Sequence, residues 1–145
     1  MYVPICPVNG DTTKFILDGM NVVAELENQN SIIYLRGNGL EGYLKNGTNR
    51  KYYYNEPNGS TYIVYGDESN QFEPVGEYAY GGFGNLIWDN WQETSFAYAG
   101  EYHDDETGFI YLRNRYYDPN TGRFISEDPA MDGLNLYVYA NNNPD

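Results

Sequence analysis

The sequence predicts an all-β fold in which antiparallel hairpins form a curved sheet or a partial shell. Short apolar stretches alternate with turn dipeptides about every ten residues, the spacing of an antiparallel meander. Aromatic residues are abundant, with 17 Tyr, 6 Phe and 2 Trp, and such side chains favour strands. The 16 Gly and 7 Pro disfavour long helices. At 145 residues, we expect one core.

The apolar stretches give the expected strands in order. They occupy residues 14–17, 21–26, 31–35, 40–44, 51–54, 61–65, 75–80, 86–91, 95–98 and 109–112. Turn dipeptides such as Asp18-Gly19 and Asn46-Gly47 separate them. Residues 1–12 lack periodicity and carry Pro4 and Pro7, so we expect an irregular lead-in or an edge strand. An aromatic strand followed by an Asp or Asn turn recurs, as in repeats that stack on one another.

Composition excludes several classes of function. The net charge of −13 opposes contact with nucleic acid and with anionic membranes. No apolar run approaches the roughly 20 residues that a membrane helix needs, and the single Cys6 has no internal disulfide partner. Residues 1–10 do not have the pattern of a signal peptide, so any export signal is expected elsewhere, and we expect the chain to be part of a longer protein.

The most informative stretch runs from Arg115 to Pro129. Tyr116 and Tyr117 have strand propensity, and the next five residues, Asp118-Pro119-Asn120-Thr121-Gly122, form a turn signal. Arg123 and Phe124-Ile125 then resume a strand, which a second Asp-Pro pair, Asp128-Pro129, ends. The stretch therefore predicts a hairpin.

This string, Tyr-Tyr-Asp-Pro-x-x-Gly-Arg-Phe-x-Ser-x-Asp-Pro, closely resembles the core segment of bacterial Rhs proteins, the YD-repeat family. The resemblance continues from Phe15 to Pro144. It implies repeat strands over residues 13–97 and a core segment over 98–145. Members of this family wrap repeat strands into a spiral β-shell around a C-terminal toxin. The resemblance thus implies a structural role without enzymatic activity, a C-terminal toxin or other polypeptide as partner, and a secreted or cell-surface location.

Asp128 is the one candidate catalytic residue. In many relatives an Asp-Pro-x-Gly motif here pairs with a second one downstream, and both aspartates are implicated in self-cleavage like that of aspartyl proteases. In this sequence Met131 replaces the Gly, and the second motif is absent. Because such a mechanism needs two carboxylates that share a proton, we expect Asp128 to act as a turn former. A second carboxylate would have to come from Asp118, Glu127, Asp132 or Asp145.

Three of the eight basic residues of the chain lie close together between positions 113 and 123: Arg113, Arg115 and Arg123. They are close in sequence to the carboxylates of Glu101, Asp118, Glu127 and Asp128. Arg can bind a carboxylate through two parallel hydrogen bonds, so we expect ion pairs here, with Arg115 and Arg123 clamping the hairpin around Asp118-Pro119.

Other clusters indicate weaker alternatives. The acidic stretch with Glu101, His103, Asp104, Asp105 and Glu106 could attract calcium, but its spacing is not that of an EF-hand, and a solvated hairpin tip is expected. No motif for a cofactor or for a zinc site is present. Trp88 and Trp91 could stack on sugars, which leaves a carbohydrate-binding or cell-wall-binding module as a rival function. We also expect self-association, because open sheet edges recruit other strands.

Overall fold

The computed structural model describes residues 2–4, 12–68, 71–90, 93–130 and 135–144. These residues form two antiparallel sheets, which confirms the predicted all-β fold. One sheet has nine strands in chain order, and the other has four, also in chain order. The elements are β1 (Tyr2–Pro4), β2 (Thr13–Asp18), β3 (Asn21–Glu27), β4 (Asn30–Arg36), β5 (Leu40–Lys45), β6 (Asn49–Asn55), β7 (Thr61–Glu68), β8 (Gln71–Tyr80), β9 (Leu86–Asn90), β10 (Tyr102–Asp104), β11 (Phe109–Leu112), β12 (Arg115–Asp118) and β13 (Arg123–Phe124), with 3₁₀ turns η1 (Tyr98–Gly100) and η2 (Ala140–Asn142).

Most expected strands are present within two or three residues of their predicted ends, but the stretch 95–98 differs. Phe96 forms an isolated β-bridge to Tyr102 in place of a strand, and the chain then turns through η1, where Ala99 has a φ of 54°. The sequence analysis did not predict β10. This short strand is polar and acidic, so it lacks the apolar pattern by which the other strands were predicted. No helix in the described part of the chain is long and apolar enough to cross a membrane.

The chain divides into two compact units, so the expectation of one core is wrong. Unit 1 comprises residues 1–54 and 64–75, and unit 2 comprises residues 55–63 and 76–145. The chain passes from one unit to the other at the end of β6, within β7 and within β8. The motif boundary expected between residues 97 and 98 falls inside unit 2, and it remains a prediction about sequence segments.

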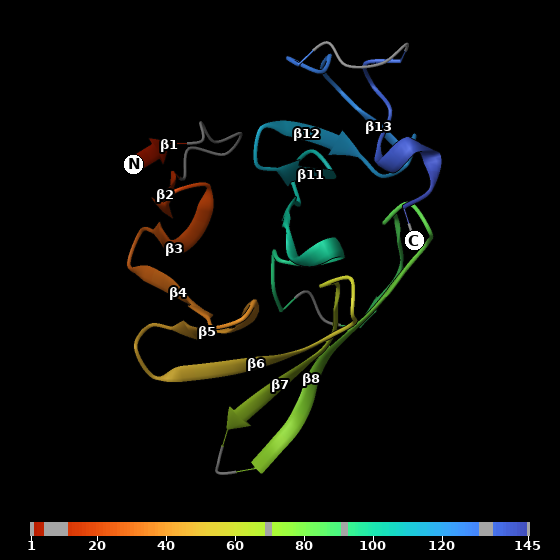
Figure 1. Ribbon diagram of the computed structural model, residues 1–145. Helices are drawn as coiled ribbons and strands as arrows, with labels where there is room; N and C mark the ends of the chain where they lie inside the picture. Colours follow the sequence, from red (N-terminus) through yellow and green to blue (C-terminus); the bar gives the residue numbers. More distant parts are fainter. Residues whose placement is uncertain (1, 5–11, 69–70, 91–92, 131–134, 145) are drawn as a thin grey trace. The chain divides into compact units, whose positions relative to one another are not determined.

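Unit 1 consists of consecutive hairpins, drawn from red to yellow-green in Figure 1. Phe15, Tyr34 and Tyr43 fill its interior, and the rings of the two tyrosines meet edge to face at 6.4 Å. The hydroxyl of Tyr34 donates a hydrogen bond to Oε1 of the buried Glu25. Tyrosine therefore serves both needs of this interior, as apolar filling and as a hydrogen-bond donor to a buried carboxylate.

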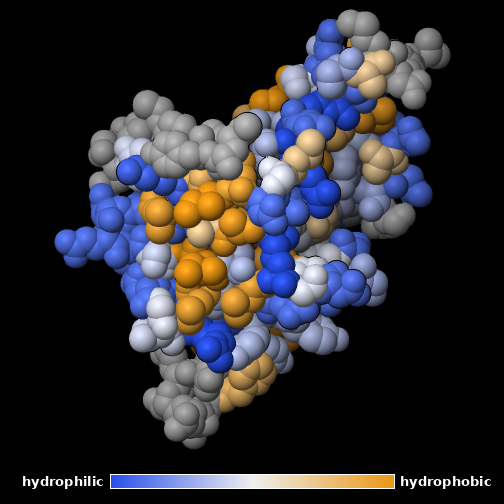
Figure 2. Space-filling view, turned by 60° about the vertical axis from the view of Figure 1, so that its left-hand side comes forward, coloured by the Kyte–Doolittle hydropathy of each residue, from blue (hydrophilic) through white to orange (hydrophobic). Residues whose placement is uncertain are grey.

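The opposite face of the same strands carries an apolar row, which we call the unit 1 apolar row. The register aligns Ile16 with Ala24, Ala24 with Ile33, and Ile33 with Leu44, so these four side chains share one face. Ile16 is 42% exposed and Ile33 is 48% exposed. Figure 2 shows the apolar area that such residues form on the surface. This face thus leaves Ile16 and Ile33 open to solvent, while the smaller Ala24 between them is buried.

Unit 2 is built around a cluster of tyrosine rings. Tyr117 is fully buried, its ring centroid is 4.4 Å from that of Tyr139, and Ile110 and Tyr98 complete the centre. The hydroxyl of Tyr117 donates a hydrogen bond of 2.7 Å to the carbonyl of Phe83. The hydroxyl of Tyr80 likewise donates to the carbonyl of Thr61 at 2.7 Å. Because these hydroxyls reach backbone carbonyls of the loop at Phe83 and of the start of β7, the cluster fixes both segments while it forms the core.

Alkaline pH should destabilise the protein through these tyrosines. Burial raises the pKa of Tyr117 and of Tyr80 well above the ordinary value of 10. Above about pH 10 the unfolded chain loses these protons while the folded chain keeps them, so the free energy of unfolding should fall by at most about 1.4 kcal/mol per pH unit for each tyrosine. Urea unfolding at a series of pH values measures this slope.

The variant Tyr117→Phe provides the comparison. At neutral pH it should lose about 1–2 kcal/mol, because the carbonyl of Phe83 loses its buried donor. Above pH 10 its slope should be shallower than that of the parent. Identical slopes for the two proteins would show that Tyr117 ionises equally easily in the folded and unfolded chains.

Candidate functional site

The core motif forms the expected hairpin. In the register of β12 and β13, Tyr117 lies opposite Phe124 and Asp118 lies opposite Arg123. The carboxylate of Asp118 accepts hydrogen bonds from the backbone N–H of Asn120 and from the hydroxyl of Thr121, both at 2.9 Å. These bonds satisfy Asp118 within its own turn, as is typical of Asp before Pro.

Glycine is required at the end of this turn. Gly122 has a φ of +69°, in the region that favours glycine, and its N–H donates to the carbonyl of Asp118 at 2.9 Å. A Cβ atom at this position would lie 3.0 Å from Cδ1 of Phe83. Pro119 is buried beside it. The motif residues Asp118, Pro119 and Gly122 therefore shape a turn that packs closely on the loop containing Phe83.

Arg115 lies at the centre of a compact polar cluster. Its guanidinium makes a 3.2 Å ion pair with Asp128 and donates a 3.2 Å hydrogen bond to the carbonyl of Leu136. Its Cζ also lies 3.5 Å from the ring centroid of Phe124, a cation–π geometry. The side chain of Arg115 is 17% exposed and that of Asp128 is 29% exposed. Arg115 thus joins the hairpin to the chain segment that follows it.

Asp128 combines this ion pair with a turn. Its carboxylate accepts a 2.9 Å hydrogen bond from the N–H of Ala130, and its own N–H donates to the carbonyl of Leu136. The neighbouring Glu127 accepts from the hydroxyl of Tyr137 at 3.1 Å, a bond that raises the pKa of Tyr137. These contacts suit a turn former held by an arginine. A role in self-cleavage needs a second carboxylate, and Met131, Asp132 and Asp145 lie outside the described residues.

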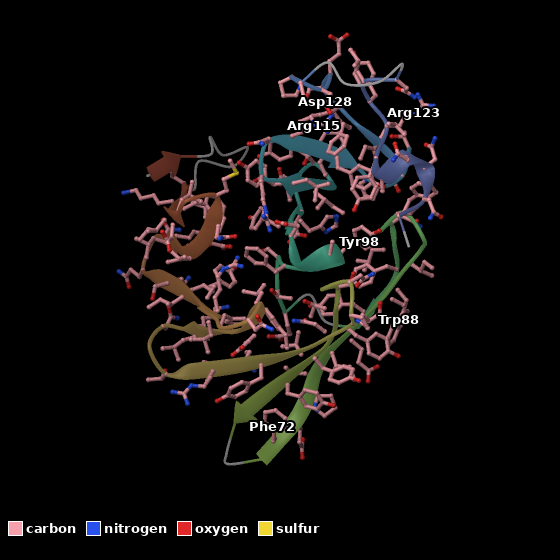
Figure 3. All side chains as sticks on the ribbon, viewed as in Figure 1. Phe72, Trp88, Tyr98, Arg115, Arg123 and Asp128 are labelled. Carbon is pink, nitrogen blue, oxygen red and sulfur yellow. The ribbon has the colours of Figure 1, made fainter. Side chains whose placement is uncertain are left out.

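The three arginines have different surroundings. Arg113 pairs with Glu101 at 3.0 Å on the surface, and Arg115 pairs with Asp128, as expected. Both Arg115 and Arg123 were expected to clamp the hairpin around Asp118-Pro119, but Arg115 pairs with Asp128 instead, and no described residue pairs with the guanidinium of Arg123. Figure 3 shows Arg123 apart from Arg115 and Asp128. Asp118 also pairs with neither arginine, because its own turn satisfies its carboxylate.

Strand alternation explains this difference. Tyr117 and Phe124 face each other across the hairpin and share one face, and Arg115, two residues before Tyr117, lies on that same face. Arg123 lies on the opposite face with Asp118. The alternation of side chains along the strands could therefore have predicted, from the sequence, that Arg115 and Arg123 lie on opposite faces of the hairpin. No comparable signal indicated that Leu136 would lie beside Arg115.

The acidic stretch forms a turn after β10. The carboxylate of Asp104 accepts hydrogen bonds from the N–H of Glu106 at 3.0 Å and from the hydroxyl of Thr107 at 2.9 Å. Glu101 pairs with Arg113, and Asp105 is exposed. Within the described residues, no group of three or more His, Cys, Asp or Glu side chains is arranged to hold a metal ion.

Of the two tryptophans that could stack on sugars, only Trp88 lies among the described residues. Trp88 on β9 is 50% exposed. Trp91 and Cys6 lie outside the described residues. In unit 1, Phe72 is 60% exposed and stacks on Tyr65 with ring centroids 4.8 Å apart and an interplanar angle of 6°. Stacking on a ligand stays a prediction for Trp88.

The comparison with protein families decides the assignment. A family model described as Teneurin YD-shell matches residues 24–145. The chain belongs to this family. The match bears out the resemblance to Rhs and YD-repeat proteins that the core motif indicated, and it includes the whole of that motif.

The relatives that this chain matches are much longer proteins. The chain is 35% identical over 153 aligned positions to the tRNA3(Ser)-specific nuclease WapA of Bacillus spizizenii, which covers 94% of this chain and 6% of that protein. It is 42% identical over 72 positions to toxin subunit YenC1 of Yersinia entomophaga, covering 46% of this chain and 7% of that protein. The crystal structure of TcdB2-TccC3-Cdc42 shares the fold with a TM-score of 0.75 at 24% identity, over 92% of this chain and 7% of that one.

Replacing Arg115 should destabilise unit 2. Arg115→Ala leaves the partly buried carboxylate of Asp128 unpaired and removes the contact with Phe124, so we expect a loss of about 3 kcal/mol in the free energy of unfolding. Chemical denaturation measures this loss. Arg113→Ala removes an exposed pair and should cost under about 1 kcal/mol. Arg123→Ala should be neutral within about 0.5 kcal/mol. Equal losses for Arg115 and Arg113 would contradict the clamp.

The chain should not cleave itself. Asp128 is held by Arg115 and by its own turn, which leaves it poorly placed to share a proton with another acid. Intact-mass measurements after long incubation at mildly acidic and neutral pH should show one full-length species. Asp128→Asn should behave in the same way. Fragments from the parent that are absent from Asp128→Asn would assign a catalytic role to this residue.

Proposed function

We propose that this chain is a non-catalytic segment of an Rhs-type shell. In this function its strands continue the shell of a longer polypeptide, and the shell presents or encloses a partner polypeptide. The observation that carries the proposal is the free outer edge of β9, at the end of the nine-stranded sheet. Such an edge presents unpaired backbone groups that suit a further strand.

The four-stranded sheet provides a contrast, because its edges are already covered. At β10, the N–H of His103 donates to the carbonyl of Ser95, and Tyr102 bridges to Phe96. At β13, the N–H of Phe124 donates to the carbonyl of Tyr137. No described residue pairs with the outer edge of β9. This difference supports β9 as the site where neighbouring shell strands continue.

The unit 1 apolar row also supports a role inside a larger assembly. Its aliphatic side chains occupy consecutive strands, and large exposed apolar areas on proteins commonly mark surfaces that other parts cover. The chain spans 6–7% of the relatives compared above. Further segments of such a parent would supply the cover.

The relatives suggest the nature of the partner and the location. Toxin subunit YenC1 supports a partner that is a C-terminal toxin or another polypeptide, and supports secretion or display at the cell surface. One relative is named a tRNA nuclease. Because this chain carries a net charge of −13, we place any such nuclease activity outside the region it shares with this chain.

A carbohydrate-binding or cell-wall-binding module is the second candidate function. The half-exposed Trp88 favours it, since exposed aromatic rings stack on sugars, and the open ring of Phe72 is a further candidate. Glycan-array binding that disappears in Trp88→Ala would favour this function over the shell. A self-cleaving role remains a third possibility only for a parent protein with a second Asp-Pro-x-Gly motif downstream.

The isolated chain should self-associate through β9. An exposed edge strand with apolar side chains pairs readily with a second copy, and Ile87 on this strand is 67% exposed. Analytical ultracentrifugation should therefore show an average mass that rises with concentration. Ile87→Lys should shift the association to at least about tenfold higher concentration, because a lysine on an edge strand opposes pairing.

A matched variant separates edge pairing from packing through the apolar row. Ile16→Lys introduces the same charge at an exposed isoleucine on the face of unit 1 and should leave the association unchanged. An effect of Ile16→Lys but not of Ile87→Lys would place the contact on the apolar row. A strict monomer over the whole concentration range would contradict the edge proposal.

A further inference from the structure

A cleft of about 230 Å³ lies on unit 2, beside the turn of the core motif. Three segments form it: the β12–β13 turn, the loop after β8, and the chain at η2. Its lining combines one cationic side chain with several carboxamides, and it includes Phe83, Asn85, Asn120, Gly122, Arg123 and Asn142.

The walls of the cleft are firmly held. The carbonyl of Phe83 accepts the hydrogen bond from buried Tyr117 at 2.7 Å, and the ring of Phe83 packs against Gly122. The loop that carries Asn85 is closed by a backbone bond from the N–H of Gly81 to the carbonyl of Asn85 at 2.8 Å. A ligand would therefore meet a largely formed site, which reduces the entropy lost on binding.

The third wall adopts an unusual backbone. Ala140, Asn141 and Asn142 have consecutive φ angles of 45°, 53° and 60°, all in the left-handed region. Residues other than glycine rarely adopt this conformation, least of all in succession, and such strain concentrates at functional sites. The N–H of Asn142 donates to the backbone carbonyl of Tyr139 at 2.8 Å, and the ring of Tyr139 packs on Tyr117 in the core. The strained turn brings Asn142 to the cleft.

The polar groups of the cleft are available to a ligand. Arg123 is exposed, and no described residue pairs with its guanidinium, unlike those of Arg113 and Arg115. In the described part of the chain, no partner is recorded for the side-chain carboxamides of Asn85 and Asn142. The nearby carboxylate of Asp118 is bonded to its own turn. The cleft therefore offers a guanidinium whose N–H donors are not used by any described residue, in a strongly acidic chain.

The chemistry of these groups indicates the ligand. Guanidinium binds carboxylate through two parallel hydrogen bonds, and carboxamides both donate to and accept from peptide groups. A sugar is less suited, because Gly122 packs against the ring of Phe83 and limits its use for stacking. We infer that the cleft binds a carboxylate of a partner polypeptide, with Arg123 holding the charge and Asn85 and Asn142 bonding the flanking peptide groups. The inference rests on the proposed function for the origin of that polypeptide.

Titration of the ¹⁵N-labelled chain with short blocked peptides tests the cleft directly. The probes are acetyl-Gly-Glu-Gly-amide, its Gln counterpart, and acetyl-Gly-Gly-Gly with a free carboxylate. The Glu peptide should shift the amide signals of Gly122 and Asn142 and bind at least about tenfold more tightly than the Gln peptide. Tighter binding of the free-carboxylate peptide than of the Glu peptide would assign the ligand as a chain terminus, which also upholds the inference.

Variants separate the charge of Arg123 from general electrostatics. Arg123→Gln should weaken binding of the Glu peptide at least about tenfold, whereas Arg50→Gln removes the same charge from unit 1 and should have no effect. Arg123→Glu should lose the Glu peptide and favour the matching Lys peptide. Equal binding of the Glu and Gln peptides, or unchanged binding by Arg123→Gln, would overturn the inference.

Two further results distinguish this inference from the proposed function. Tighter binding of methyl glucuronide than of the Glu peptide would overturn the assignment to a polypeptide. A chain that stays monomeric yet binds the Glu peptide through Arg123 would retain the cleft and reject edge pairing at β9. A chain that associates through β9 but binds none of the peptides would contradict the inferred binding at the cleft and leave the proposed function intact.

Discussion

The buried hydroxyl of Tyr117 is the contact on which unit 2 depends. Its ring fills the centre of the core, and its hydroxyl reaches the carbonyl of Phe83 in a loop 34 residues earlier. Leaving this carbonyl without a donor would cost free energy of folding, so the hydrogen bond holds the loop and the hairpin together. The Arg115 cluster lies on one side of this hairpin, and the carboxamide-lined cleft adjoins its turn.

Charge is distributed unequally over the core motif. Arg115 is committed to Asp128, to the carbonyl of Leu136 and to the ring of Phe124, which suits a structural clamp. Arg123 is on the opposite face of the hairpin and has no described partner. A motif that looks like one signature in sequence thus serves two purposes, since one arginine stabilises the fold and the other remains available for binding. Asp128 likewise has a structural role, because its carboxylate is bound by Arg115 and by the N–H of Ala130.

Local patterns predicted most of the strands, because each hairpin here connects neighbours in sequence. The dipeptides Asp18-Gly19 and Asn46-Gly47 lie at real turns between β2 and β3 and between β5 and β6. Prediction failed at residues 95–98, where the apolar run enters η1, and at β10, which polar residues conceal. In both places the backbone bonds that decide the structure come from partners outside the local pattern, such as the bond from His103 to Ser95.

For this protein, the sequence by itself determined the all-β class, the order of the hairpins, the turn of the core motif and the family. These properties depend on residues close together along the chain, where propensity, alternation and turn chemistry act. Only the tertiary structure decided which arginine is paired, because the partners of Arg115 include a carbonyl 21 residues away. It also decided that Phe83, Gly122 and Asn142 line one cleft. Such contacts are set by the packing of rings in the core, which spacing along the chain does not encode.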